Sequence, residues 1–290
     1  MKKGIVLDIG GTKIRDSLIT DDLVILETKY HETPHKSKEK LIDIIVEIVL
    51  EAKKKEEIKF IGIDIPGITR ERSYIVTAPN LRDFDNIALA DILEDKLGIR
   101  PVVIDDRLAY TRGELNHYGS QNMVVFLIGT GIGAGIVCDG NIIKGSRGIT
   151  GIIGWNVSRE YLGKKTRVGF LEEKISGRGI EKLMRRNAIS AKEVFRASDS
   201  GDPMSAKTLE MVSNELVANI INISNLLNTE LFILNGTVGI ELGKRFSDSM
   251  NKKVRENGNK YVVENVKVIT SELKEKAPLI GLAIEAMDID

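Results

Sequence analysis

The amino-acid sequence predicts an α/β protein, and two observations carry this prediction. Short apolar runs that end in Gly or Asp, typical of buried strands, alternate with segments whose apolar residues recur at helical spacing. In addition, residues 5–22 and 124–141 can be aligned without gaps, each with an apolar run, a turn beginning Ile-Gly, a second apolar run and a polar turn. Any two β-hairpins share some of this pattern. We nevertheless favour an internal duplication, with two domains built on the same plan.

The remaining elements follow in chain order. Ser37 is a good N-cap for the first expected helix, and Pro203 suits the first turn of the longest one. No low-complexity linker separates the halves, so we expect an N-terminal domain of residues 1–110, completed by the C-terminal helix 277–290, and a C-terminal domain of residues 111–276. Further strands are expected at 60–65, 102–104 and 231–234, and helices at 37–56, 107–116, 203–228 and 277–288.

Composition excludes several classes of protein. The chain has 290 residues, 42% of them hydrophobic and 29% charged, as in globular proteins, and its 42 Lys and Arg balance its 42 Asp and Glu. A protein that binds nucleic acid through electrostatics needs a basic excess. No run of about 18 apolar residues is present to span a membrane, and Asp8 interrupts the short apolar start too early for a signal peptide. We therefore expect a cytoplasmic protein with neither a nucleic-acid nor a membrane partner.

The first hairpin turn has residues suited to a polyphosphate and its metal ion. Asp8 interrupts an apolar strand, where an unpaired buried carboxylate would cost several kcal/mol. It should therefore meet a cation, water or hydrogen-bond donors. Gly10 and Gly11 let backbone N–H groups approach a ligand closely, while Thr12 and Lys13 add a hydroxyl group and a positive charge. The alternative is a tight hairpin that needs glycines only for its geometry.

A second glycine turn, Gly129-Thr130-Gly131, begins the repeated hairpin. Its glycine spacing invites comparison with dinucleotide-binding folds, which require a strand, then glycines, then a helix. Here residues 136–138 indicate another strand, followed by a polar turn, so we reject the dinucleotide fold and predict a second phosphate-binding hairpin. Gly236, which follows the buried strand 231–234, is a candidate for contact with a nucleotide base or ribose.

Two adjacent carboxylates, Asp105 and Asp106, lie at an expected strand-to-helix junction. One of them could simply cap the helix. Adjacent carboxylates also repel each other, which raises a pKa as a general base requires, and the two interpretations are evenly matched from the sequence. By contrast, His31 and His35 lie in a polar segment and are expected at the surface.

The two glycine hairpins, the intervening Asp and the late glycine turn resemble the actin-like ATPase (ribonuclease H-like) fold, with two domains around an interdomain cleft. More narrowly, the chain resembles the ROK family of sugar kinases and repressors over nearly its whole length. Its repressor branch carries an additional N-terminal module, whereas here the first phosphate motif starts at once. The segments that carry the resemblance are 7–15, 65–67, 78–81, 101–106, 128–133, 169–172 and 277–283.

This resemblance implies an ATP-dependent kinase that phosphorylates the 6-hydroxyl of a hexose or N-acetylhexosamine such as glucose, N-acetylmannosamine or N-acetylglucosamine. Asp106 would be the catalytic base, and Asp8 would hold Mg²⁺ directly or through water. The family often dimerises, so a homodimer is expected. The implied contacts to ATP are Gly10, Gly11, Thr12, Lys13, Gly129, Thr130, Gly131 and Gly236, and those to the sugar are Asn80, Asp105 and Glu172.

The chain also departs from the family pattern. Ile152 and Trp155 replace a sugar-binding Glu and a His that binds sugar and zinc, and Cys138 is the only cysteine. The segment 163–170, where the family has its zinc-binding cysteines, contains none. We therefore expect no structural zinc, with apolar packing around Trp155, Phe170 and Leu171 in its place. The lost contacts leave a second interpretation open, a sugar-binding sensor that does not catalyse. Asp105 replaces the usual Asn, and Asp16 and Asp64 stand where small residues are usual.

Overall fold

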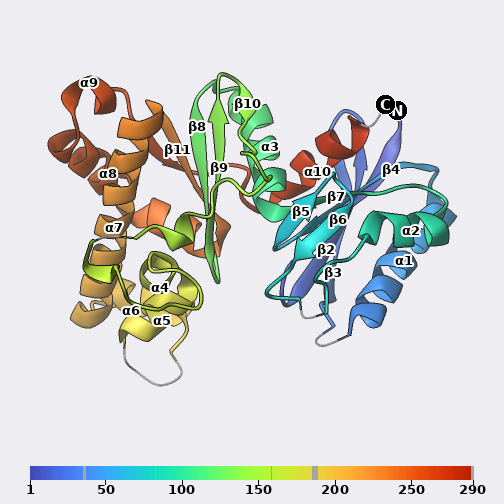
Figure 1. The fold of residues 1–290 in the computed structure, drawn as a ribbon, viewed down its shortest axis with the longest axis horizontal. Helices are drawn as coiled ribbons and strands as arrows, with labels where there is room; N and C mark the ends of the chain where they lie inside the picture. Colours follow the sequence, from blue (N-terminus) through green and yellow to red (C-terminus); the bar gives the residue numbers. More distant parts are fainter. Residues whose placement is uncertain (35–36, 82, 158, 185–188, 289–290) are drawn as a thin grey trace. The chain divides into compact units, whose positions relative to one another are not determined.

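A computed structural model describes residues 1–34, 37–81, 83–157, 159–184 and 189–288, which form two compact units (Figure 1). The first unit comprises Met1–Tyr118, Lys144–Ile149 and Glu275–Asp290, and the second comprises Gly119–Ile143 and Thr150–Lys274. Each contains a five-stranded sheet with helices, which confirms the α/β class. The boundary expected after residue 110 lies within helix α3 (Asp106–Tyr118), and this helix belongs as a whole to the first unit.

The sheet of the first unit has the strand order β3-β2-β1-β4-β7. Strands β1, β2 and β3 pair antiparallel, whereas β1, β4 and β7 run parallel, so the carboxyl ends of these last three share one edge. The elements are β1 (Lys3–Ile9), β2 (Lys13–Thr20), β3 (Ile25–Glu32), α1 (Lys38–Lys55), β4 (Ile58–Ile65), β5 (Ile68–Arg70), β6 (Tyr74–Thr77), α2 (Leu89–Leu97), β7 (Val102–Asp105), α3, a 3₁₀ turn (Lys274–Lys276) and α10 (Ala277–Met287).

Alternating side chains of this sheet fill two cores. Ile5 and Leu7 of β1 pack in one core with residues of α1 and α2, while Val6, between them, packs in the other with residues of α3 and α10. This follows from the period of two along a strand. Ser37 caps α1 as expected, because its side chain accepts a hydrogen bond from the N–H of Lys40.

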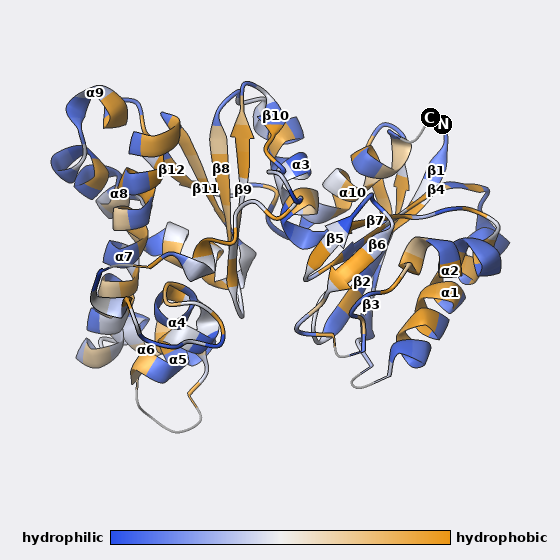
Figure 2. Cartoon of the chain, in the orientation of Figure 1, coloured by the Kyte–Doolittle hydropathy of each residue, from blue (hydrophilic) through white to orange (hydrophobic). Residues whose placement is uncertain are grey.

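The second unit repeats the plan. Its sheet has the order β10-β9-β8-β11-β12, again with an antiparallel hairpin joined to parallel strands. Strands β8 and β11 are largely apolar in Figure 2, whereas α8 carries residues of both kinds. The elements are β8 (Met123–Ile128), β9 (Ile132–Cys138), β10 (Asn141–Ile142), 3₁₀ turns (Ile153–Trp155 and Arg159–Tyr161), α4 (Glu172–Ile175), α5 (Gly177–Met184), α6 (Ala191–Asp199), α7 (Pro203–Leu227), β11 (Leu231–Asn235), α8 (Gly236–Asn257), α9 (Lys260–Val263) and β12 (Lys267–Thr270).

Both predicted hairpins are therefore confirmed. The second glycine turn leads into strand β9, which pairs antiparallel with β8, so the rejection of a dinucleotide fold was correct. Among the described residues, no helix is long and apolar enough to cross a bilayer.

Helix α10 packs closely against α3 in the first unit. The approach needs glycines, because a Cβ at Gly281 would lie 1.8 Å from the carbonyl oxygen of Ala109. The carboxylate of Glu285 on α10 is fully buried and accepts hydrogen bonds from Arg112 Nε on α3, at 2.5 Å, and from Arg72. These contacts hold α3, which begins with Asp106, in place on the sheet.

Candidate active site

The first glycine turn joins β1 to β2. The N–H of Gly10 donates to the carbonyl of Lys13 at 2.8 Å, and the hydroxyl of Thr33 donates to the carbonyl of Gly10 at 2.8 Å. A Cβ at Gly11 would lie 3.5 Å from the Cβ of Asn80. The structure thus brings Asn80, predicted at the sugar end of the site, against the turn predicted to hold phosphates.

A row of charged residues crosses the first sheet beside this turn. Strand pairing places Asp8 opposite both Arg15 on β2 and Asp64 on β4. The guanidinium group of Arg15 forms ion pairs with Asp8 and, at 2.9 Å, with Glu275. Asp64 is fully buried, and its Oδ1 accepts the N–H of Ile9 at 3.2 Å. Of the partners expected for Asp8, which were a cation, water or hydrogen-bond donors, the protein itself supplies a cation, Arg15.

Three residues in or beside this row, Arg15, Asp64 and Tyr110, had no predicted role. Arg15 follows from the hairpin register, since a turn between Ile9 and Ile14 pairs residue 15 with residue 8. The pKa of Asp64 is raised well above its usual range, mainly by burial and further by the charges of Asp8 and Asp106. The pKa of Tyr110, one turn into α3, is also raised, by burial and then by Asp8. Neither effect has a signal in the local sequence.

The adjacent carboxylates Asp105 and Asp106 differ in their surroundings. Asp105 is buried, and its Oδ1 accepts the N–H of Leu108 at 3.2 Å and Nε of Arg107 at 3.1 Å, so it makes the capping bond. Asp106 is partly buried at the first position of α3, and its Oδ1 accepts the N–H of Arg107 at 2.9 Å. Burial raises the pKa of Asp106 to about 7, and the charge of Asp105 adds to this effect.

The second glycine turn lies against Glu172 in the second unit. The N–H of Gly129 donates to the carbonyl of Gly131 at 2.9 Å, which closes the turn. Oε2 of Glu172 accepts the N–H of Ile132, the next residue, at 3.1 Å. Burial raises the pKa of Glu172, and this hydrogen bond opposes the effect. Glu172, predicted at the sugar, is therefore bonded to the residue that follows the predicted phosphate turn.

Gly236 is the first residue of α8 and has a φ of +80°, a conformation that favours glycine. A Cβ at this position would lie 2.5 Å from the carbonyl oxygen of Ile128, immediately before the second glycine turn. Gly236, Gly129 and Thr130 are thus grouped at one end of β8, although the tight fit of Gly236 is with the protein's own backbone.

The expectation about Trp155 is wrong. Its side chain is 53% exposed, and of the three residues expected to brace the segment only Leu171 is buried. The rings of Tyr161 and Phe170 stack at 4.7 Å instead. In addition, the hydroxyl of Thr166 accepts two backbone N–H groups of the following turn. A bulky indole does not fill this turn because backbone hydrogen bonds already close it.

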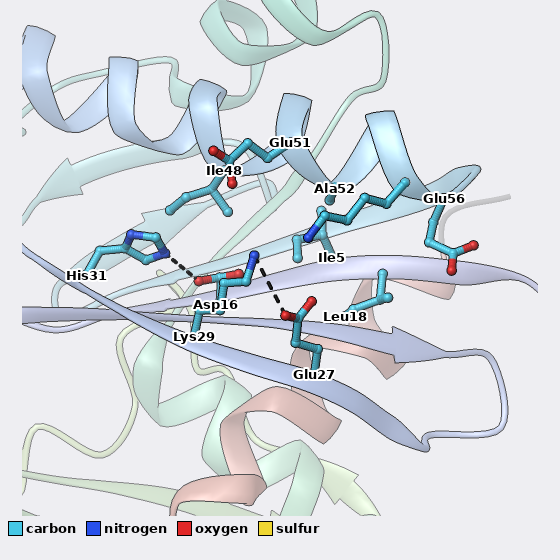
Figure 3. Close-up of a pocket in the computed structure, with 11 residues that line it drawn as sticks. Ile5, Asp16, Leu18, Glu27, Lys29, His31, Ile48, Glu51, Ala52 and Glu56 are labelled. Atoms are coloured by element: carbon cyan, nitrogen blue, oxygen red, sulfur yellow. Dashed lines mark hydrogen bonds and ion pairs between the residues drawn. The ribbon is translucent and has the colours of Figure 1, made fainter.

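A hollow between α1 and strands β2 and β3 contains none of the predicted site residues (Figure 3). In it, Nε2 of His31 lies 2.7 Å from Oδ1 of Asp16. Asp16 points away from Arg15 because neighbouring residues of a strand face opposite sides of the sheet. His31 is therefore not a plain surface residue as expected, since its side chain is only 33% exposed and has a partner. His35 lies outside the described residues.

Comparison with known proteins shows which family this arrangement belongs to. The model of the ROK family matches residues 4–288. The chain belongs to the ROK family. A glucokinase from Thermotoga maritima is 28% identical, with 97% of this chain and 96% of that protein covered. An N-acetylmannosamine kinase from Yersinia pseudotuberculosis is 27% identical, with 84% and 86% covered.

The fold of this ROK protein also matches solved structures. A ROK family glucokinase from Streptomyces griseus, in complex with glucose and AMPPNP, superposes with a TM-score of 0.83 at 25% identity, covering 98% of this chain and 99% of that one. The actin-like ATPase fold is therefore confirmed.

Within the described ranges, no group of three or more His, Cys, Asp or Glu residues is placed to hold a metal ion.

Proposed function

We propose that this ROK protein is an ATP-dependent kinase that phosphorylates the 6-hydroxyl of a hexose or an N-acetylhexosamine. The observation that carries the proposal is the position of Asp106, directly after β7 at the edge of the sheet where β1 also ends beside Asp8. One carboxylate is thus available for the acceptor hydroxyl and another for the nucleotide's metal ion. The kinases of glucose and N-acetylmannosamine among its relatives support the same reaction class.

Asp106 would accept the proton of the sugar hydroxyl as its oxygen attacks the γ-phosphorus. Phosphoryl transfer requires little more of a protein than positioning and electrostatic stabilisation. A base works best when its pKa is near the working pH, and burial raises the pKa of Asp106 to about 7. Asp105, by contrast, shares its Oδ1 between Arg107 and the start of α3, so we assign it only to orienting the sugar.

The residues around Asp8 suit MgATP as a substrate. Mg²⁺ usually binds one or two carboxylates together with phosphate oxygens and water. Asp8 would hold the ion directly or through water, with Arg15 beside it to limit the build-up of negative charge. The N–H groups of Gly10 and Gly129 close the two turns, so we assign the phosphates to the N–H groups that follow them, at Gly11–Thr12 and at Thr130–Gly131. Lys13 lies next to the first of these turns, and Gly236 is assigned to the adenosine.

For the sugar we propose contacts from Asn80 and Glu172. Ile152 and Trp155 present apolar surface where a Glu and a His are usual in the family, and Trp155 is exposed enough to touch a ligand. An apolar surface of this kind selects less strongly for a sugar with a plain 2-hydroxyl group, and it tolerates the methyl group of a 2-acetamido substituent. We therefore include N-acetylmannosamine and N-acetylglucosamine beside glucose.

A coupled assay of ADP release over a panel of hexoses and N-acetylhexosamines tests the proposal. We expect turnover with at least one of them in the presence of Mg²⁺ and ATP. Sugar binding detected by calorimetry without any turnover would instead support a sensor of the same fold.

Because we expect no structural zinc, treatment with a zinc-selective chelator should leave the fold unchanged. The turn around Thr166 is closed by hydrogen bonds and by the stacking of Tyr161 on Phe170, and Cys138 lies elsewhere, on β9. A zinc-selective chelator should therefore not alter the melting temperature. A chelator that also removes Mg²⁺ should stop ADP release, and added Mg²⁺ should restore it. A melting temperature that falls with the zinc-selective chelator would contradict this expectation.

A further inference from the structure

The second glycine turn and the carboxylate of Glu172 are fitted to each other. Oε2 of Glu172 accepts the N–H of Ile132 at 3.1 Å, and a Cβ at Gly131 would lie 2.8 Å from that same oxygen. Real Cβ atoms are essentially never found so close, so an alanine at Gly131 must displace the carboxylate. A methyl group at residue 131 would therefore act on Glu172, a side chain of this protein, whether or not a phosphate is bound.

The carboxylate is also confined on its other side. A Cβ at Gly154 would lie 3.2 Å from the Cβ of Glu172 and 3.3 Å from its Oε2. The carbonyl of Gly154 accepts the N–H of Leu171, the residue before Glu172, at 3.0 Å. Glu172 is therefore held between two backbone segments, and a shift of the glycine turn moves the surface on which its carboxylate rests.

We propose that Glu172 couples the sugar end of the site to the phosphate end, with one carboxylate oxygen fixing the second glycine turn and the other available to a sugar hydroxyl. This inference rests on the proposed function, which assigns Glu172 to the sugar. A carboxylate has about four lone-pair positions, so one hydrogen bond to Ile132 leaves room for further donors. Because hydrogen bonds to an ionised acceptor are the stronger kind, the turn depends on the charge of Glu172.

Coupling of this kind is reciprocal. If a bound sugar orders Glu172 and Glu172 orders the turn, the sugar must tighten binding of the nucleotide by the same factor by which the nucleotide tightens binding of the sugar. A second consequence is less expected: a change in the phosphate turn that displaces the carboxylate of Glu172 should weaken sugar binding even when no nucleotide is present.

Two alanine variants of the same turn test this consequence. Calorimetry measures the affinity of each, without nucleotide, for the sugar that the wild type phosphorylates fastest. We expect Gly131→Ala to weaken sugar binding by about 5-fold or more, because its methyl group displaces the carboxylate. Gly129→Ala is the matched control, since its Cβ would meet only the hydroxyl of Thr237 at 3.8 Å, and its sugar affinity should stay within about 2-fold of the wild type.

A second experiment tests the reverse effect, of Glu172 on the nucleotide, by measuring the binding of AMPPNP with Mg²⁺ in the absence of sugar. Glu172→Gln keeps the shape but removes the charge, so we expect AMPPNP to bind several-fold more weakly. Glu173→Gln is the control, because Glu173 pairs with Thr166 and Lys182 and makes no hydrogen bond to the turn. This arm does not depend on Gly131→Ala being folded, which thermal unfolding checks.

The outcomes separate the two proposals. A wild-type protein that phosphorylates no sugar would overturn the proposed function, while the AMPPNP arm would still report whether Glu172 fixes the turn. A wild type that phosphorylates a sugar, combined with equal sugar affinities for Gly131→Ala and Gly129→Ala, would overturn the coupling alone. Unchanged AMPPNP affinity in Glu172→Gln would do the same.

Discussion

Replacement of Asp106 by alanine is expected to lower sugar-dependent ADP release by about 100- to 10,000-fold, the usual contribution of a positioned general base. Binding of AMPPNP should change little, because the residues assigned to the phosphates remain. Steady-state kinetics and calorimetry measure the two effects separately. Asp43→Ala, at an exposed position of α1 that is 63 residues before Asp106, is the control and should keep wild-type turnover.

The pH dependence gives this prediction a second measurement. Asp106 acts as a base only when it is deprotonated, and burial raises its pKa from 3.8 to about 7. The value of kcat/KM should therefore rise as the pH increases through about 7 and level off above it. A profile that is flat between pH 5 and pH 8 would argue against Asp106 as the base.

The stability of the protein should change with pH in the opposite direction to kcat/KM, falling as the pH rises. Because the folded state holds this proton more tightly than the unfolded state, Asp106 contributes stability at low pH that is lost as the pH rises through about 7. Asp106→Asn removes a partly buried negative charge at high pH. We expect its melting temperature to exceed that of the wild type by a few degrees at pH 8, with a smaller difference at pH 5. Such an inactive but more stable variant is typical of a site residue.

Substitution of Gly281 by alanine should cause a large loss of stability. Its Cβ would lie 1.8 Å from the carbonyl oxygen of Ala109, so α10 and α3 must separate. Overpacking typically costs 1–3 kcal/mol, and a clash with backbone belongs at the upper end, about 3 kcal/mol. For a protein of this size the melting temperature should fall by about 6–12 °C. Thermal unfolding followed by circular dichroism measures the change.

Gly239→Ala is the matched control for this substitution. Gly239 also lies within a helix, α8, but its Cβ would meet the side chain of Ile128 at an ordinary 3.5 Å. Alanine is favoured over glycine inside a helix by about 0.5–1 kcal/mol, so this variant should match or exceed wild-type stability. If both variants lost stability equally, the close approach of α3 and α10 would not be the cause.

Much of the fold could be predicted from the sequence because its determinants are local. The apolar runs on either side of Gly10 and of Gly129 specify hairpins, and helical spacing behind Ser37 specifies α1. The polar residues Asp8 and Asp106 are likewise visible, because Asp8 interrupts an apolar run and Asp106 belongs to the acidic pair that ends one. The family could be predicted as well, since its motifs keep their order along the whole chain.

Other features depend on contacts between distant parts of the chain. The hydrogen bond from Ile132 to Glu172 joins residues 40 positions apart, and it changes the interpretation of Gly131. The pairing of Glu285 with Arg72 joins residues 213 positions apart. Trp155 was expected to be buried, yet it is exposed because its neighbours close the turn without it.

The sequence by itself thus determined the α/β class, the two hairpins and the residues able to carry the chemistry, because strand, turn and helix patterns depend on neighbouring residues. Only the tertiary structure decided which of these side chains are already engaged. It paired Asp8 with Arg15, gave the capping bond to Asp105 rather than Asp106, and placed Glu172 on the second glycine turn. The partner and burial of a charged group are set by the packing of whole strands and helices, which no local pattern contains.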